Sequence, residues 1–360
     1  MPNATEASLH RRSFLAVSGA AAGAHLLGRP AFAQGAQVKG AGAGFPRETF
    51  AAWAEAAKGP AGVRVAYDAV GPNDGLAKVV NREVEFATTA SPMSAARLRD
   101  RRLVQFPSML GAVVFTANLP GVAAGELKLT GENIADLYLG KIKRWNDPRL
   151  AEHNPGLRLP DLAVAPVYRS DISGATLLAT TFLSRASETW RDGGPRAGTV
   201  VLWPVGKGGH TNEGVAEAVQ AAPGAIGYVS NAFAVSKRLA AAQLRNRSGA
   251  FVKPEAASFQ AAAEAADWGA RNFAVDLLDL EGAAAWPIVG PSFTLLPIDP
   301  EADKAEGVRG AMKFFDWALA NGGEIARRTG SAPLPAAVGK AVREAWASVK
   351  APDGQPLWKG

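Results

Sequence analysis

The chain has 360 residues, and it contains no cysteine and only four histidines. The lack of cysteine excludes disulfide bonds, thiolate metal sites, a cysteine nucleophile and a lipid-modified cysteine anchor. Beyond residue 33, no stretch approaches the roughly 18 to 20 apolar residues that a membrane-spanning helix needs. No two histidines have the spacing of a helical metal site, and the acidic residues are scattered. We therefore expect neither a metal nor a cofactor.

Residues 1–33 have the pattern of an export signal. The paired Arg11 and Arg12 precede Ser13-Phe14-Leu15, a Gly/Ala-rich apolar stretch and the cleavage pattern Ala31-Phe32-Ala33. The arginine pair and the weakly apolar middle favour the twin-arginine route, which exports folded proteins. The alternative is a disordered basic tail, which the Ala-x-Ala ending disfavours. We expect a soluble periplasmic protein without a lipid anchor.

The mature chain keeps a mild positive charge. Residues 1–33 carry Arg11, Arg12 and Arg29 against Glu6, so their removal lowers the formal net charge from +6 to +4. This balance suits an anionic ligand without requiring one. The basic residues are dispersed, which argues against a nucleic-acid partner. With 48% hydrophobic residues overall, the remaining chain can form two cores, so we expect two lobes.

Short β-rich runs alternate with helical ones along the first third of the chain. Strands are predicted at 38–41, 63–67 and 86–88, and helices at 46–57, 75–80 and 92–99. Further on, alanine-rich runs predict helices at 240–242 and 256–266. In open α/β sheets, ligands bind beside the carboxyl ends of strands. We therefore expect four turns to converge on one cleft, at Gly44-Phe45, Pro72-Asn73, Ala90-Ser91 and 169–175.

Residues 168–176 are typical of a strand that leads into a helix through an anion-binding turn. Arg169 and Asp171 follow an apolar run, and Ser173 stands where it would cap a helix beginning at Gly174. The unpaired N–H groups and the positive dipole end of that helix would attract an anion. Serine and aspartate before a helix are also ordinary caps, so the turn alone leaves both interpretations open.

Further motifs give the chain a family resemblance. In order, they are Gly40 to Pro46, Phe106-Pro107, Tyr138 to Trp145, Asn154 to Leu157, Arg169 to Gly174, Trp203-Pro204, Pro223 to Tyr228, Ala266 to Trp268, Ala285 to Ile288 and Phe314 to Ala318. With this set, the mature chain resembles the periplasmic phosphate-binding protein of high-affinity phosphate ABC importers over nearly its whole length.

The resemblance implies an α/β, two-lobed periplasmic-binding-protein fold of type II, with mixed sheets flanked by helices. Lobe I would comprise residues 34–118 and 290–360 and lobe II residues 119–289, with two crossover segments forming a hinge. It also implies a monomer that captures an inorganic oxyanion, first of all phosphate. The ligand would then pass to an ABC permease and its ATPase subunits.

The resemblance also implies the ligand residues. Arg169 would clamp the oxyanion and Asp171 would orient it, while Ser173, Gly174 and Ala175 donate hydrogen bonds from the helix start. Gly44 and Phe45 would supply the first turn of the opposite lobe. Three further polar residues are expected to add donors: Asn73, Thr89 and Ser91.

Four of the family's ligand positions differ here. Gly44 and Ala175 stand where the family has threonine, and Pro72 stands where it has serine. Ala90 replaces the aspartate that would accept the proton of phosphate and repel sulfate. Capture of sulfate, an organophosphate or a phosphonate is therefore an alternative. A scaffold, adhesion or sensor protein on the same fold is another.

An enzyme is not expected. Ser173 has no evident histidine partner, because His153 lies beside a Pro-Gly loop and His210 lies in a glycine-rich loop. Both histidines are interpreted as exposed loop residues.

Overall fold

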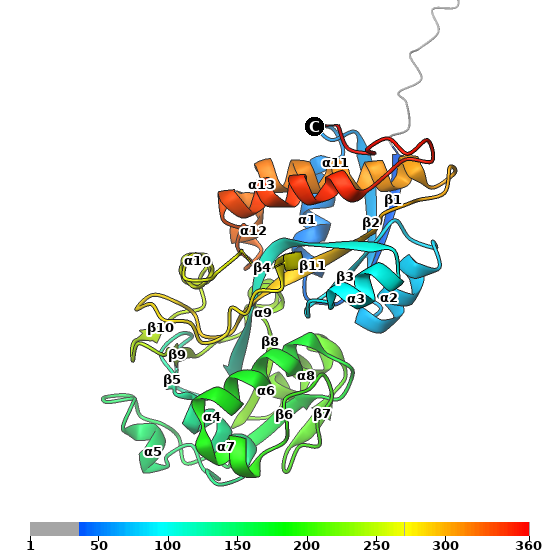
Figure 1. The fold of residues 1–360 in the computed structure, drawn as a ribbon. Helices are drawn as coiled ribbons and strands as arrows, with labels where there is room; N and C mark the ends of the chain where they lie inside the picture. Colours follow the sequence, from blue (N-terminus) through cyan, green and yellow to red (C-terminus); the bar gives the residue numbers. More distant parts are fainter. Residues whose placement is uncertain (1–35, 270, 360) are drawn as a thin grey trace, which may run out of the picture. The chain divides into compact units, whose positions relative to one another are not determined.

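The computed structural model describes residues 36–269 and 271–359, so the predicted export signal lies outside the described residues. The larger of two sheets has, in spatial order, β2 (Val63–Asp68), β1 (Ala36–Gly42), β3 (Phe86–Thr89), β11 (Val289–Pro297), β4 (Leu103–Ala117), β8 (Ala225–Ser230), β6 (Ala165–Arg169) and β7 (Lys207–Gly209). A smaller sheet has the order β10 (Phe251–Val252), β9 (Gln243–Arg245) and β5 (Lys128–Leu129). The fold is thus α/β (Figure 1).

Helices follow most strands of the larger sheet. They are α1 (Arg47–Ala57), α2 (Pro72–Val80), α3 (Ala95–Asp100), α4 (Gly131–Tyr138), α5 (Pro148–Ala151), α6 (Gly174–Ala186), α7 (Glu188–Gly193), α8 (Thr211–Ala221), α9 (Asn231–Lys237), α10 (Ala256–Glu264), α11 (Ala305–Asn321), α12 (Gly323–Arg328) and α13 (Ala336–Ala345). None of the helices in the described part of the chain is both long and apolar enough to cross a membrane.

Strand β4 joins the two parts of the larger sheet. Its residues 103–112 pair antiparallel with β11, and residues 113–117 pair antiparallel with β8. On one side β1, β2 and β3 are parallel to one another, and on the other side β6, β7 and β8 are. Because β3 and β8 run in opposite directions, the carboxyl ends of the two sets face each other near the middle of β4.

Two large hydrophobic clusters support these two sets of strands. One gathers the apolar faces of α1, α11 and α13, with the buried aromatic residues Phe50, Trp53, Phe86, Phe314 and Trp346. The other gathers α4, α6 and α8, with Tyr138, Trp145, Phe182, Trp190 and Tyr228. Each fully buried side chain of this size contributes on the order of 1.5–3 kcal/mol through loss of water contact. The two clusters hold the strand ends of each set in place.

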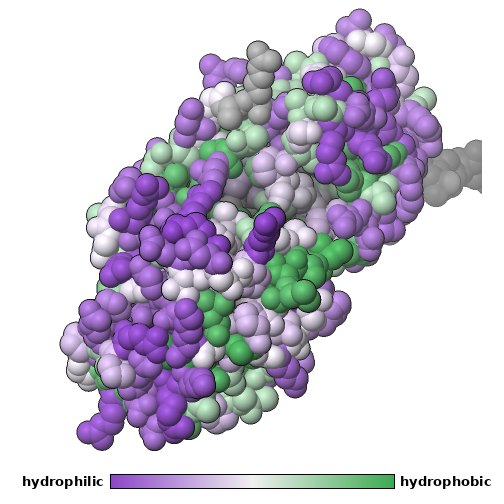
Figure 2. All heavy atoms as spheres, turned by 60° about the horizontal axis from the view of Figure 1, so that its bottom comes forward, coloured by the Kyte–Doolittle hydropathy of each residue, from purple (hydrophilic) through white to green (hydrophobic). Residues whose placement is uncertain are grey.

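The outer surface is mostly hydrophilic on the face seen in Figure 2, with hydrophobic side chains in smaller patches. Among the described residues, the large hydrophobic side chains that are exposed are Ile172, Val200, Leu202, Val205 and Val235. Exposure of a few large hydrophobic side chains is normal for a folded protein.

Several predicted elements have different boundaries. The helix predicted at 92–99 begins at Ala95, because Ser94 caps it by accepting from the Arg97 N–H and the Met93 N–H is held by Gln105 Oε1 at 2.8 Å. Helix α2 begins at Pro72, earlier than predicted. The predicted helix at 240–242 is wrong, because Ala241 forms a β-bridge with Thr116.

Candidate functional site

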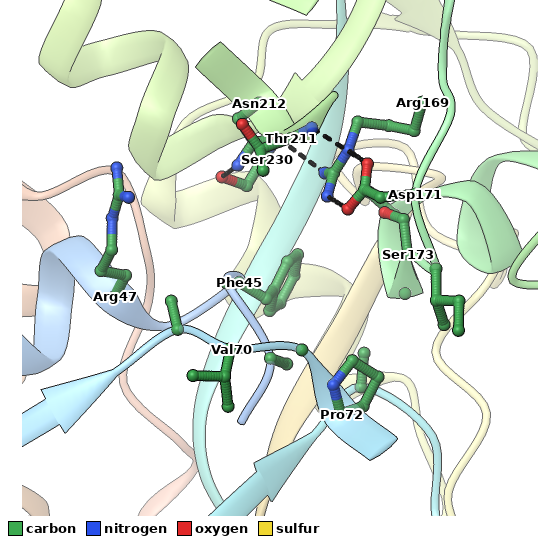
Figure 3. A pocket seen from close by; sticks show the side chains of 18 of the residues that line it. Phe45, Arg47, Val70, Pro72, Arg169, Asp171, Ser173, Thr211, Asn212 and Ser230 are labelled. Carbon is green, nitrogen blue, oxygen red and sulfur yellow. Dashed lines mark hydrogen bonds and ion pairs between the residues drawn. The ribbon is translucent and has the colours of Figure 1, made fainter. Parts of the chain in front are cut away.

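The carboxyl ends of β1, β2, β3, β6, β7 and β8 surround one cavity of about 290 Å³ (Figure 3). The turns after these strands lead into the N-termini of α1, α2, α6 and α8, which also line it. Several helix N-termini around one space supply N–H groups and positive dipole ends to the same point. The cavity therefore favours an anion, although it also contains carboxylates.

Arg169 is the central cation of this cavity. Its Nε and Nη2 donate to the two carboxylate oxygens of Asp171 at 2.7 and 2.5 Å, and its Nη1 donates to Asn212 Oδ1 at 3.0 Å. The side chain is only 10% exposed. A guanidinium has five N–H donors, so these bonds leave donors for a ligand while holding the group in one orientation.

Asp171 is held in its charged form. Burial alone would raise the pKa of Asp171, but the hydrogen bonds and charge of Arg169 and the N–H of Thr211, 3.0 Å away, outweigh burial and lower it. An ionised Asp171 neutralises most of the charge of Arg169 and fixes its position. The Arg169 guanidinium therefore offers a ligand N–H donors in a fixed direction more than it offers a net positive charge.

The start of α6 lies beside this guanidinium. Ser173 caps the helix, because its Oγ accepts from the Thr176 N–H at 3.4 Å. The N–H groups of Gly174 and Ala175 precede the first intrahelical bonds, so they remain available to a ligand. A Cβ at position 174 would lie 2.4 Å from the Cβ of Ala90, so glycine allows α6 to approach the end of β3 closely.

A further set of hydrogen bonds fixes the clamp, that is, Arg169 with Asp171 and the start of α6. Asn212 Nδ2 donates to Ser230 Oγ at 3.1 Å while its Oδ1 accepts from Arg169. The Tyr228 hydroxyl lies 2.8 Å from Thr176 Oγ1. Burial raises the pKa of Tyr228 to about 12, so this hydroxyl keeps its proton. Strands β6 and β8 and helices α6 and α8 are thereby tied together around Arg169.

A second arginine lines the opposite side of the cavity. Arg47, at the start of α1, forms ion pairs with Glu48 and with Glu213 of α8. Burial would raise the pKa of Glu213, but the hydrogen bonds from Arg47 and the Thr211 hydroxyl lower it. In contrast, burial raises the pKa of Glu48, whose Oε2 is buried and has no hydrogen-bond partner among the described residues.

Most of the predicted site residues lie together. Arg169, Asp171, Ser173, Gly174, Ala175, Gly44, Phe45 and Asn73 all line the cavity, as do Pro72 and Ala90. Figure 3 shows Phe45 and Pro72 across the cavity from Arg169 and Ser173. The sequence motifs therefore predicted which segments meet.

Two predicted site residues lie outside this cavity. Thr89 and Ser91 are not among its lining residues, and Ser91 instead lines a separate, mainly apolar cavity with Pro92 and Leu178. The Thr89 hydroxyl accepts from the Ser91 N–H and donates to the Ser91 carbonyl, both at 3.2 Å. This local turn occupies the hydroxyl that was expected to face a ligand.

Other lining residues were missed. They are Ala43, Arg47, Ala69, Val70, Gly71, Ile172, His210, Thr211, Asn212, Glu213 and Ser230. A signal for the group at 210–213 was present, because it follows a glycine-rich strand and begins a helix, as residues 173–174 do. His210 is exposed, as expected, but it borders the cavity.

The site combines six converging strand ends, an orientated arginine and several helix N-termini. Residues 28–321 match the model described as the PBP superfamily domain, so the fold and site are those of a two-lobed solute-binding protein. Within that class, the chain belongs to the PstS family of phosphate-binding proteins. It is 41% identical over 328 residues to the phosphate-binding protein PstS of Pasteurella multocida, which covers 91% of this chain and 94% of that protein. The Haemophilus influenzae PstS is 38% identical, with coverage of 89% and 95%.

Solved structures show the same fold. A high-affinity periplasmic phosphate-binding protein with bound phosphate, PfluDING, has a TM-score of 0.68 and 23% identity, covering 86% of this chain and 93% of that one. A phosphate-binding protein from Stenotrophomonas maltophilia has a TM-score of 0.60 and 22% identity, with coverage of 86% and 93%. At these identities the likeness establishes the architecture rather than the ligand.

Proposed function

We propose that this protein captures phosphate outside the cytoplasm and delivers it to an ABC importer. The observation that carries the proposal is Arg169, fixed by Asp171 and Asn212 beside the free N–H groups of Gly174 and Ala175. Hydrogen bonds to a charged group are each worth about 1.5–3 kcal/mol. A few such bonds around the largely buried Arg169 guanidinium are enough for tight binding of a small oxyanion. The names of the family relatives support phosphate as that oxyanion.

The ligand residues proposed are Gly44, Phe45, Asn73, Arg169, Ser173, Gly174 and Ala175, with Asp171 as the residue that orients Arg169. The proposed lobes are residues 34–118 with 290–360, and 119–289, with crossover segments near residues 118 and 290. The change of pairing partner along β4 at residues 112–113, a few residues before that boundary, supports a crossover in this strand. We further propose that the protein is exported by a twin-arginine signal, carries no lipid anchor and is a monomer. It would hand its ligand to a permease with its ATPase. Catalysis is not part of the proposal.

A second candidate ligand is a larger oxyanion, such as an organophosphate or a phosphonate. One observation favours it: a Cβ placed on Gly44 would have no atom within 4 Å, so the cavity has open space at the first turn. Such space suits a substituent on the oxyanion.

Calorimetry on protein stripped of ligand by unfolding and refolding tests these alternatives. The wild type would be titrated with phosphate, sulfate, methylphosphonate and glycerol phosphate, and Arg169→Ala would serve as the site control. Tight binding of phosphate that Arg169→Ala abolishes is the expected result. Preference for a substituted oxyanion would replace phosphate with the second candidate, and no binding of any anion would favour a scaffold or sensor role.

A further inference from the structure

An ion pair crosses the cavity away from the Arg169 clamp. Arg47 begins α1, and its Nη2 donates to Glu213 Oε1 in the first turn of α8. The buried face of α1 packs in the cluster with α11, whereas the buried face of α8 packs in the cluster with α6. The pair therefore links the two hydrophobic cores directly, and it can form only when the two sides of the cavity are close.

The same pair is connected to the clamp by an unbroken series of contacts. Glu213 Oε2 accepts from the Thr211 hydroxyl at 2.9 Å, and the Thr211 N–H donates to Asp171 Oδ1 at 3.0 Å. Asp171 in turn holds Arg169 through two hydrogen bonds. A contact from α1 thus reaches the guanidinium through α8.

We propose that Arg47 and Glu213 form a latch that stabilises the closed state of the protein and positions the Arg169 clamp through Thr211. This inference rests on the proposed capture of an oxyanion by lobe closure. A contact present only in the closed state raises the closed fraction, and the apparent dissociation constant falls by the same factor. The side chains of Arg47 and Glu213 are 44% and 38% exposed, so the latch remains accessible to solvent and can open.

The effect of neutralising Glu213 on phosphate affinity distinguishes a latch from a purely electrostatic effect of Glu213 on the anion. If Glu213 acted only as a negative charge near the anion, its neutralisation would strengthen phosphate binding, while neutralisation of Arg47 would weaken it. For a latch, either change removes the same contact, so both weaken binding. The sign of the Glu213→Gln effect therefore separates the two accounts.

The test is a double-mutant cycle on the full mature chain, with Arg47→Gln, Glu213→Gln and the double variant titrated with inorganic phosphate. Ion pairs of this exposure are worth about 0.2–1 kcal/mol, so each single change should raise the dissociation constant up to about fivefold. The double variant should be no weaker than the weaker single variant. Stopped-flow measurements should assign the change caused by Glu213→Gln mainly to faster dissociation, because the latch forms after the ligand enters.

The pair Arg327 and Glu324 on α12 provides a matched control, because it does not line the cavity. Its glutamine variants should bind phosphate as the wild type does. Phosphate binding by Glu213→Gln that equals or exceeds that of the wild type would overturn the latch alone. A wild type that binds no oxyanion would overturn the proposed function, and the latch with it.

Discussion

The hydroxyl of Tyr228 accepts a hydrogen bond from the backbone N–H of Arg169, with 3.2 Å between nitrogen and oxygen. A side chain of β8 thus fixes the last residue of β6, where the strand leads into the turn of the clamp. Because this hydroxyl keeps its proton, it also serves as a partner for Thr176 Oγ1 in α6. One buried group therefore aligns the strand end and the helix start that together hold the proposed ligand.

Tyr228→Phe should destabilise the protein and weaken phosphate binding. The change leaves the buried Thr176 hydroxyl and the Arg169 N–H without this partner, and an unsatisfied buried group costs about 1–3 kcal/mol. Urea unfolding measures the stability, and calorimetry measures the affinity. Tyr168→Phe is the control, because Tyr168 stacks on Trp203 and no bond of its hydroxyl is found among the described residues. Equal stability of both variants would contradict the prediction.

Asn212→Ala should weaken phosphate binding by more than its effect on stability explains. The substitution removes the acceptor of Arg169 Nη1, one of the three contacts that position the guanidinium. Hydrogen bonds to charged groups are worth about 1.5–3 kcal/mol, which sets an upper limit near a hundredfold. Asn231→Ala provides a comparison, since the Asn231 amide is also buried but donates to the Gly330 carbonyl at 2.8 Å. We expect both variants to lose stability and only Asn212→Ala to lose affinity. Similar affinities in calorimetry would remove Asn212 from the clamp.

The turns that meet at the cavity could be predicted, but the individual side-chain contacts between distant segments could not. Arg169, Asp171 and Ser173 lie within five residues, so helix-capping rules and the strand-to-helix change indicated a possible anion-binding turn. The family resemblance implied that Asp171 orients Arg169. Asn212 reaches Arg169 only because β7 pairs with β6, and Arg47 and Glu213 are 166 residues apart. No local pattern encodes such a meeting.

For Thr89, the sequence indicated the position of the residue but not the hydrogen-bond partner of its hydroxyl. The strand predicted at 86–88 extends one residue further, and β3 ends at Thr89. However, a threonine hydroxyl can bond either to a ligand or to its own backbone, and here the turn with Ser91 takes it. The sequence indicates where such a hydroxyl lies along the chain. Whether it bonds to a ligand or to its own backbone depends on the backbone angles of the turn.

Gly174→Ala should lower both stability and affinity, because the new Cβ would lie 2.4 Å from the Cβ of Ala90. Relief requires a shift of α6 away from β3, and overpacking of this kind costs about 1–3 kcal/mol. The double variant Gly174→Ala with Ala90→Gly should recover much of the loss, since it removes the atom that clashes. Gly44→Ala is the matched control from the same cavity, because its Cβ would meet nothing within 4 Å. Thermal unfolding and phosphate titration of the four proteins test this.

Asp171 and Glu48 should make opposite contributions to the pH dependence of stability. The pKa of Asp171 is lower in the folded protein than its usual value, so its stabilising effect is complete above the unfolded pKa and is lost as the pH falls through the folded one. Asp171→Asn should therefore be less stable than the wild type at pH 7, and the difference should shrink below about pH 4.

The pKa of Glu48 is raised by burial, so ionisation of this carboxyl opposes folding as the pH rises above its unfolded value. Glu48→Gln should consequently be more stable than the wild type at pH 7 and lose that advantage below about pH 4. Urea unfolding of both variants and the wild type between pH 3 and pH 7 gives the two differences. If both variants are more stable than the wild type at pH 7, the pairing of Asp171 with Arg169 does not outweigh the burial of Asp171. If both are less stable, Arg47 compensates the burial of Glu48.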